Sequence, residues 1–176
     1  AREDWRDPNW RNLVHFREES LAHFLRDAKK TITSVNPEGV IFLNAGNMDG
    51  SGWRVARDNA VCAPYQDFNG AECFYHPGND RFALHAWSML AKYLTAEDIP
   101  AVVFSHHALG SWHYLPLPEL ESEISIAQTV ANGANPWIAV FVHALDADKE
   151  RAIRPIDKMN GFIEKHEDYF TATESA

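Results

Sequence analysis

Short apolar runs alternate along the chain with longer stretches in which apolar residues recur every three or four positions. The runs have the length of buried strands, and the longer stretches have the periodicity of amphipathic helices. The strand-like segments are residues 40–43, 67–75, 101–104 and 137–142. The helix-like segments are residues 13–32, 81–94, 119–132 and 155–169, with a weaker one at 53–59. The pattern predicts the order α-β-(α)-β-α-β-α-β-α.

Regular alternation of strands and helices predicts an α/β fold with a parallel sheet and right-handed crossovers. A closed barrel needs about eight strands, so the strands predicted here form either a small open sheet or half of a barrel. We expect one β/α domain at residues 13–170, preceded by an N-terminal arm at 1–12 and followed by a C-terminal tail at 171–176.

Composition narrows the classes of partner and compartment. The 176 residues carry a net charge of −9, from 16 basic and 25 acidic residues, which disfavours nucleic acid and anionic membranes because phosphate binding needs clustered Lys and Arg. No apolar run reaches the roughly 18 residues of a membrane span, and the first residues do not resemble a signal peptide. Cys62 and Cys73 favour free thiols, although a single bridge between them stays open. The lack of a leader and of a disulfide framework favours a cytoplasmic protein.

Residues capable of chemistry gather at the ends of the predicted strands. In parallel α/β folds the working side chains lie at this edge, so we expect these residues to converge on one rim. The candidates are Asn44, Asn47 and Asp49 after the first strand, Asp67, Glu72, Tyr75 and His76 near the second, Ser105, His106, His107, Trp112 and His113 after the third, and His143, Asp146 and Asp148 after the fourth.

Some of these candidates have more than one interpretation. Glu72 has apolar neighbours, so it is either a partly buried general acid or a structural carboxylate. Because neighbours on a strand alternate faces, one of His106 and His107 is expected at the rim and the other in the core.

Two motif-based functions have weak support. Ser105 lacks the Gly-x-Ser-x-Gly elbow of a hydrolase nucleophile. The Gly-rich loop at 46–52 lacks a nucleotide-binding pattern.

A His-based metal site remains an alternative, because imidazole suits zinc, but its spacing matches no standard motif. Its ligands would be His106, His107, His113 and His143.

Several short motifs together resemble a known family. They are Trp5-Arg6-Asp7-Pro8-Asn9-Trp10, Phe16-Arg17-Glu18-Glu19-Ser20, Asn36-Pro37 before a strand that ends at Asn44, Phe68-Asn69-Gly70-Ala71-Glu72, Gly110-Ser111-Trp112, and Ala127-Gln128-Thr129-Val130-Ala131-Asn132-Gly133-Ala134. This set resembles the hypothetical glycosyl hydrolase 6 family, which is similar to family-42 β-galactosidases and to α-L-fucosidase-like barrels.

The resemblance implies that the four predicted strands correspond to strands five to eight of a TIM (β/α)8 barrel. In that clan one catalytic Glu follows strand four, which has no counterpart here, and the other follows strand seven. The matching place here reads Phe104-Ser105-His106-His107 and has no carboxylate. The resemblance therefore leaves Glu72 as the candidate acid/base.

The same resemblance implies sugar-binding roles for other rim residues. Trp112 is expected to stack on a pyranose, while Asn44 and one of the two adjacent histidines, His106 and His107, bond hydroxyls. The remaining candidates for substrate binding are Asp67 and His143.

The first hypothesis is a glycoside-hydrolase-like domain that is incomplete as an isolated chain. The alternatives are a non-catalytic carbohydrate-binding or assembly module and a His-based metal-dependent hydrolase. No cofactor is expected. We expect carbohydrate as a ligand, and either a second copy or a missing N-terminal half barrel as a protein partner, because a half barrel leaves apolar surface open.

Overall fold

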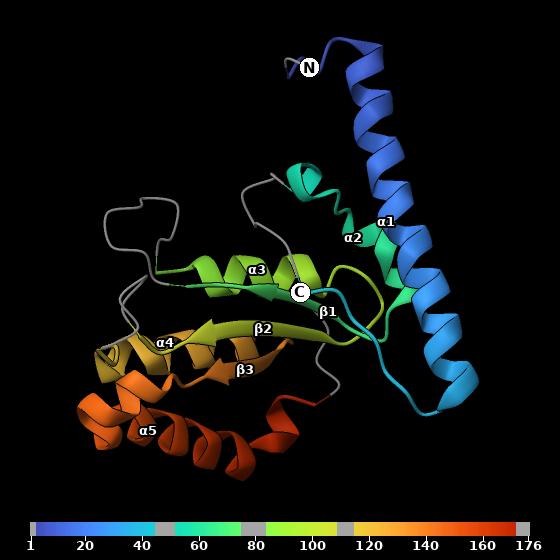
Figure 1. Ribbon diagram of the computed structural model, residues 1–176. Helices are drawn as coiled ribbons and strands as arrows, with labels where there is room; N and C mark the ends of the chain where they lie inside the picture. Colours follow the sequence, from blue (N-terminus) through green and yellow to red (C-terminus); the bar gives the residue numbers. More distant parts are fainter. Residues whose placement is uncertain (1–2, 45–51, 75–83, 109–114, 172–176) are drawn as a thin grey trace.

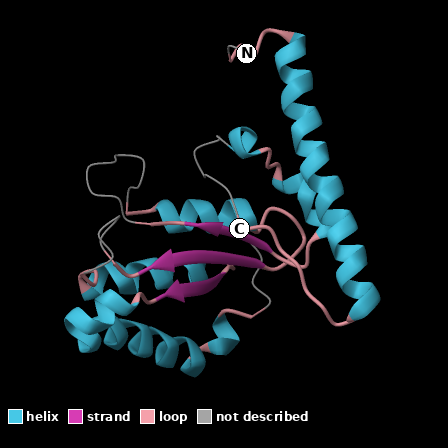
Figure 2. Ribbon diagram, viewed as in Figure 1, coloured by secondary structure: helices cyan, strands magenta, loops and turns pink. Residues whose placement is uncertain are grey.

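The computed structural model describes residues 3–44, 52–74, 84–108 and 115–171, which form an α/β protein with a parallel sheet (Figures 1 and 2). In these ranges the sheet has the order β1-β2-β3, with β1 at Asn69–Glu72, β2 at Ala101–His106 and β3 at Asn135–Ala139. Both strand pairs are parallel. The α/β class is thus confirmed, whereas the first of the four predicted strands, residues 40–43, is missing from the sheet.

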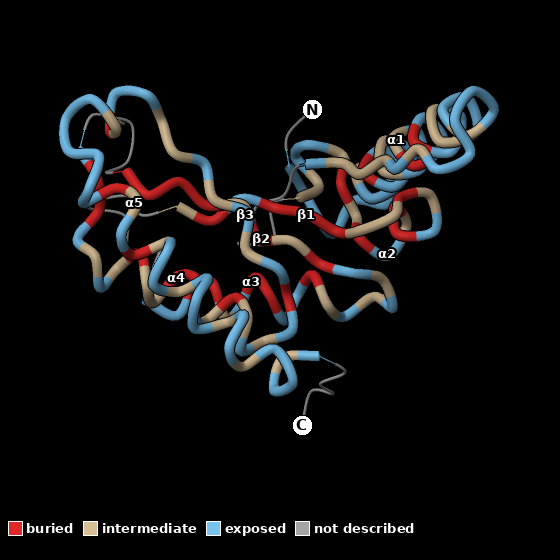
Figure 3. The backbone as a smooth tube through the Cα atoms, turned by 90° about the horizontal axis from the view of Figure 1, so that it is seen from below, coloured by how far each residue is buried: buried red, intermediate tan, exposed pale blue. Residues whose placement is uncertain are grey.

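The helices that join the strands lie together on one side of the sheet (Figure 3). The connections are α3 (Ala86–Leu94) between β1 and β2, and α4 (Glu119–Ala131) between β2 and β3. Trp87 and Leu90 of α3 are buried in one core cluster with Val103 of β2. Right-handed crossovers between strands in sequential order place successive helices on the same side. The opposite side of the sheet, which we call the bare face, has no covering helix among the described residues.

Residues 40–43, an apolar run predicted to be a strand, are not one. Only Asn44 pairs with β1, through an isolated parallel bridge to Gly70. Polar side chains hold the rest of the segment: Asp67 Oδ2 accepts from Ile41 N–H (2.8 Å), and Gln66 Oε1 accepts from Leu43 N–H (3.1 Å). Side-chain acceptors therefore occupy amide groups that a strand would use in its ladder.

The N-terminal helix α1 (Pro8–Val35) begins inside the predicted arm. Asp7 caps it by accepting from Asn9 N–H (2.8 Å), and Pro8 follows the cap, which is favourable because a first-turn residue needs no intrahelical N–H bond. The helix packs against α2 (Asn59–Cys62) and the short turn η2 (Ala63–Tyr65). Figure 1 shows α1 beside the sheet, with its N-terminal part projecting past the other elements.

The last helix, α5 (Val142–Lys165), begins well before the predicted start at residue 155. It contains one non-helical residue, Asp148, whose Oδ1 caps the second part by accepting from Arg151 N–H (3.0 Å). The charged stretch before residue 155 hides the apolar periodicity, which is why the early turns were missed. Two short turns complete the chain, η1 (Gly52–Val55) and η4 (Glu167–Tyr169).

Two further expectations can be compared with the structure. Cys62 and Cys73 are free and buried, which confirms the thiols, and burial raises the pKa of Cys73 to about 12. No described helix combines the length and the apolar character needed to cross a membrane.

Candidate functional site

Two of the predicted rim residues meet at the carboxyl end of β1. Glu72 ends the strand, and Asn44 Nδ2 donates a hydrogen bond to Glu72 Oε1 (2.9 Å). Both side chains are exposed, so the expected partial burial of Glu72 is wrong. The reason is the alternation of the strand: Ala71 and Cys73 take the helix side, and Glu72 projects from the bare face. The pair offers a carboxylate and an amide to a polar ligand.

A row of four aromatic rings lies beside this pair on the bare face. The ring row consists of Phe68, Phe42, Phe104 and Trp137. It bends at Phe104, so that the ring centroid of Trp137 also lies 6.1 Å from that of Phe42. Successive ring centroids are 4.3, 5.5 and 4.6 Å apart, with interplanar angles of 24°, 15° and 36°. Trp137, which contacts both Phe104 and Phe42, is 51% exposed and so offers part of its indole to a ligand.

Strand register places two members of the ring row, Phe104 and Trp137, level with Glu72 of the polar pair. Glu72 is opposite Phe104, and Phe104 is opposite Trp137. Neighbouring strands lie about 4.8 Å apart, so Glu72 and Trp137 stand two strand spacings, or about 10 Å, from each other. One flat ligand can therefore reach both.

The two adjacent histidines point to opposite sides of the sheet, as expected. His106 lies on the bare face, with its ring 4.1 Å from that of Phe74 and 5.3 Å from that of Phe141. His106 is nevertheless only 5% exposed, so its ring is buried against these aromatic neighbours and is not open to a sugar hydroxyl as predicted.

His107 does not belong to the rim. Its Nε2 lies 3.2 Å from Ser125 Oγ of α4, beneath the sheet, and its Nδ1 has no hydrogen-bond partner among the described residues. Burial is the main cause that lowers the pKa of His107 to about 4, and the nearby His106 contributes less. The ring is therefore neutral at neutral pH. Its predicted contact with sugar hydroxyls is therefore replaced by a role in the core.

Asp67, another predicted binding residue, lies before β1 and hence at the opposite end of the strand from Glu72. It accepts hydrogen bonds from Lys29 Nζ and Ile41 N–H, both at 2.8 Å. Burial alone would raise the pKa of Asp67, but these hydrogen bonds outweigh it and lower the pKa. Asp67 thus links α1 and residues 40–43 to the segment that leads into β1.

The fourth strand end supplies three exposed candidates, His143, Asp146 and Asp148, all of which lie in α5. His143 stands in the first turn of α5, which begins directly after β3, so topology places it at the carboxyl edge with Glu72. Trp112, the residue expected to stack on sugar, lies outside the described residues. So do the other loop candidates Asn47, Asp49, Tyr75, His76 and His113.

Sequence reasoning missed the residues that hold Asn44 in place. Arg57 is 4% exposed, and its Nη1 donates to the carbonyl oxygen of Leu43 (2.8 Å). Gln66 is 3% exposed and binds the N–H of the same residue. No local signal in the sequence could have shown this, because each contact joins a loop side chain to backbone more than ten residues away.

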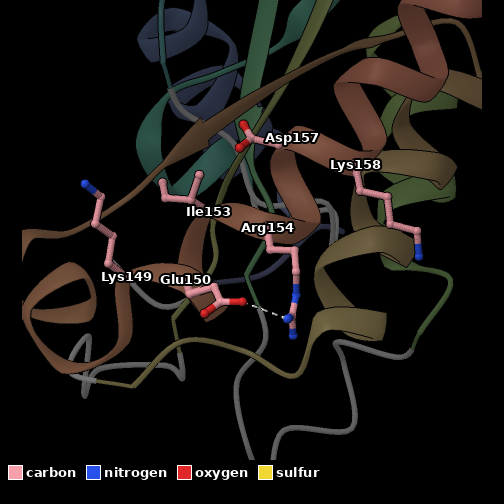
Figure 4. Close-up of a pocket in the computed structure, with 6 residues that line it drawn as sticks. All are labelled: Lys149, Glu150, Ile153, Arg154, Asp157 and Lys158. Carbon is pink, nitrogen blue, oxygen red and sulfur yellow. Dashed lines mark hydrogen bonds and ion pairs between the residues drawn. The ribbon is translucent and has the colours of Figure 1, made fainter.

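A surface hollow of about 770 Å³ runs along α5 (Figure 4). Its lining residues are Lys149, Glu150, Ile153, Arg154, Asp157 and Lys158. Arg154 bonds Glu150 (3.1 Å) and Glu119, and Lys158 bonds Glu123 (2.7 Å). Two of the cations are therefore engaged in joining α5 to α4, and the hollow adds no group to the rim.

Neither metal chemistry nor known relatives help to identify the site. Among the residues that the structure describes, no three His, Cys, Asp or Glu side chains gather as ligands for a metal ion. Comparison with known proteins finds no family model, curated protein or solved structure that matches the chain.

Proposed function

We propose that this chain is the carboxy-terminal half of a glycoside-hydrolase-like (β/α) barrel and that its rim binds carbohydrate around Asn44 and Glu72. The observation that carries the proposal is the hydrogen-bonded Asn44–Glu72 pair, exposed at the carboxyl end of a parallel strand and level with Trp137. Carbohydrate sites combine such polar groups, which bond hydroxyls, with an aromatic face that covers the apolar side of a sugar ring.

Each group has a distinct part in this site. Glu72 accepts hydrogen bonds from sugar hydroxyls through its carboxylate, and Asn44 orients it through the 2.9 Å bond. Trp137 stands about 10 Å from Glu72, two strand spacings away, and its exposed indole packs on a ring of the same oligosaccharide. The other three rings pack on one another and on Trp137, so they support its position.

Glycosidic hydrolysis needs two carboxyl groups on either side of the bond. Glu72 is the candidate acid/base, and the segment that follows β2 reads His107-Ala108 after the strand ends at His106, without a carboxylate. The isolated chain is therefore expected to bind sugar with little or no turnover. The same feature favours the alternative, a non-catalytic carbohydrate-binding or assembly module.

The bare face belongs to the same proposal. A sheet with sequential strand order and helices on one side is the arrangement of a barrel segment, whose other side would face the interior. We propose that a second copy of the chain or an N-terminal half barrel covers it.

The test is sugar binding by the purified chain. Isothermal titration with gluco-, galacto- and fuco-configured oligosaccharides should give binding that Glu72→Gln weakens about tenfold, because a hydrogen bond to a charged group is worth about 1.5–3 kcal/mol. Trp137→Ala should weaken it to a similar extent. Release of p-nitrophenol from the corresponding glycosides, if any, should vanish in Glu72→Gln.

The matched control is Glu38→Gln, which removes the same charge from an exposed carboxylate beyond the end of α1, away from the rim. It should bind as the unaltered chain does. The carbohydrate proposal fails if no sugar binds at millimolar concentration, or if Glu72→Gln and Glu38→Gln bind equally well.

A further inference from the structure

Residues 40–44 stand beside β1 in the place of a strand, yet side chains hold them there. We call Asp67, Gln66 and Arg57 the side-chain clasp. Asp67 binds the N–H of Ile41, Gln66 binds the N–H of Leu43, and Arg57 binds the carbonyl of Leu43. Two backbone contacts accompany the clasp: Asp67 N–H donates to the Ile41 carbonyl (2.8 Å), and Asn44 forms the isolated bridge to Gly70.

Arg57 is the member of the clasp nearest to the rim. Its guanidinium is buried, and its Nε donates to Asn59 Oδ1 (2.8 Å), a side chain that is itself 3% exposed. Asn59 begins α2, which packs on α1, so the guanidinium is fixed to the helical part of the molecule. Burying a charge is costly unless it is well bonded, and here the bonds join that helical part to Leu43.

The carbonyl of Leu43 and the N–H of Asn44 belong to one planar peptide group. Holding that carbonyl at 2.8 Å therefore fixes the orientation at which the chain enters Asn44. The Asn44 side chain then lies 2.9 Å from Glu72 Oε1. Because both side chains are exposed, water competes for this hydrogen bond, and ordering a surface side chain costs conformational entropy. A fixed backbone at Asn44 reduces that cost.

We infer that Arg57 is a positioning residue, which sets the Asn44 amide against the Glu72 carboxylate by gripping the Leu43 carbonyl. Its importance for ligand binding rests on the proposed function of that pair. The geometric role does not, and it can be measured without a ligand.

The experiment compares the side-chain amide resonances of Asn44 by ¹⁵N–¹H NMR at pH 7. Glu72→Gln, which removes the carboxylate, should shift these resonances, and the size of that shift measures the contact between the two side chains. Arg57→Met, which removes the donors but keeps an extended side chain, should reduce the amplitude of the shift caused by Glu72→Gln at least threefold. Asn59→Ala, which frees the guanidinium without deleting it, should give an intermediate amplitude.

A general loss of stability must be distinguished from a loss of positioning. Thr129→Val supplies the control, because Thr129 is 1% exposed, bonds the Ser125 carbonyl (2.8 Å) and lies in α4. It should lower the unfolding midpoint and leave the Asn44 shift unchanged. Full amplitude in folded Arg57→Met, or in folded Asn59→Ala if Arg57→Met does not fold, overturns the inference. Failure to bind sugar would leave this result untouched.

Discussion

Gly70 allows the rings of the bare face to meet. A Cβ at this position would lie 2.7 Å from Phe104 Cε2 and 3.2 Å from Phe42 Cδ2. Both rings are stacked on neighbours in the ring row, so neither can swing away freely. Gly70→Ala should therefore destabilise the fold by about 1–3 kcal/mol, the usual cost of overpacking. Urea unfolding measures the change.

Gly161→Ala is the matched control for that substitution. Gly161 lies inside α5, and a Cβ there would meet nothing within 4 Å. Alanine is a better helix former than glycine, so this change should stabilise the fold by about 0.5–1 kcal/mol. Equal stabilisation by both substitutions would contradict the close packing of Phe42 and Phe104 over Gly70.

His107 predicts a pH dependence of stability. Burial holds its pKa near 4, whereas the unfolded chain returns it to about 6.5. Between these values the unfolded state binds a proton that the native state does not, so stability present above pH 6.5 is lost as the pH falls toward 4. The loss should be on the order of 3 kcal/mol. Urea unfolding at pH 7 and pH 4.5 measures it.

His107→Gln removes this titration and keeps an amide that can reach Ser125. Its free energy of unfolding should fall less between the two pH values than that of the unaltered chain. Asp67 does not confuse the comparison: its pKa is lowered, so its contribution is lost only at more acidic pH. Equal losses in both proteins would show that His107 is not buried as described.

At the scale of elements, local patterns predicted the parts of the fold that depend on local physics. The segments 101–104 and 119–132 became β2 (Ala101–His106) and α4 (Glu119–Ala131), because an apolar run and a helical period are both recorded in consecutive residues. Residues 40–43 have the same apolar character as β2. They do not form a strand, because the side chains of Asp67, Gln66 and Arg57 bind backbone groups of Ile41 and Leu43 that a strand would pair with its neighbour. These side chains are distant in the sequence, so the local pattern does not show them.

In the candidate site, too, some features follow from the order of the elements and others depend on distant contacts. Asn44 and Glu72 meet because strand ends in a parallel sheet share one edge, a rule that needs only the order of the elements. The placement of Asp67 depended on where β1 begins, two residues later than the predicted strand. The exposure of Glu72 depended on the lack of a covering layer over the bare face, which the sequence does not record.

At the scale of the whole molecule, two regions with exposed aromatic residues differ in kind. The bare face carries the ring row, with Trp137 51% exposed, next to β3, whose outer edge is unpaired in the described residues. The exposed side of α1 carries Phe16 and Phe24, which are 65% and 66% exposed. Contiguous aromatic surface beside an open strand edge favours association, whereas single aromatic residues on a helix are common on soluble proteins.

We therefore predict that the isolated chain self-associates through its bare face. Light scattering on a size-exclusion column at about 100 μM should give a mass above the 19.9 kDa of one chain. Trp137→Lys should restore the mass of a monomer, because a charge buried in an apolar interface costs several kcal/mol and each 1.4 kcal/mol is about tenfold in affinity. Phe24→Lys makes the same change at an exposed aromatic residue of α1 and should leave the mass high. A monomer at every concentration would contradict self-association, and a monomer in Phe24→Lys alone would move the interface to α1.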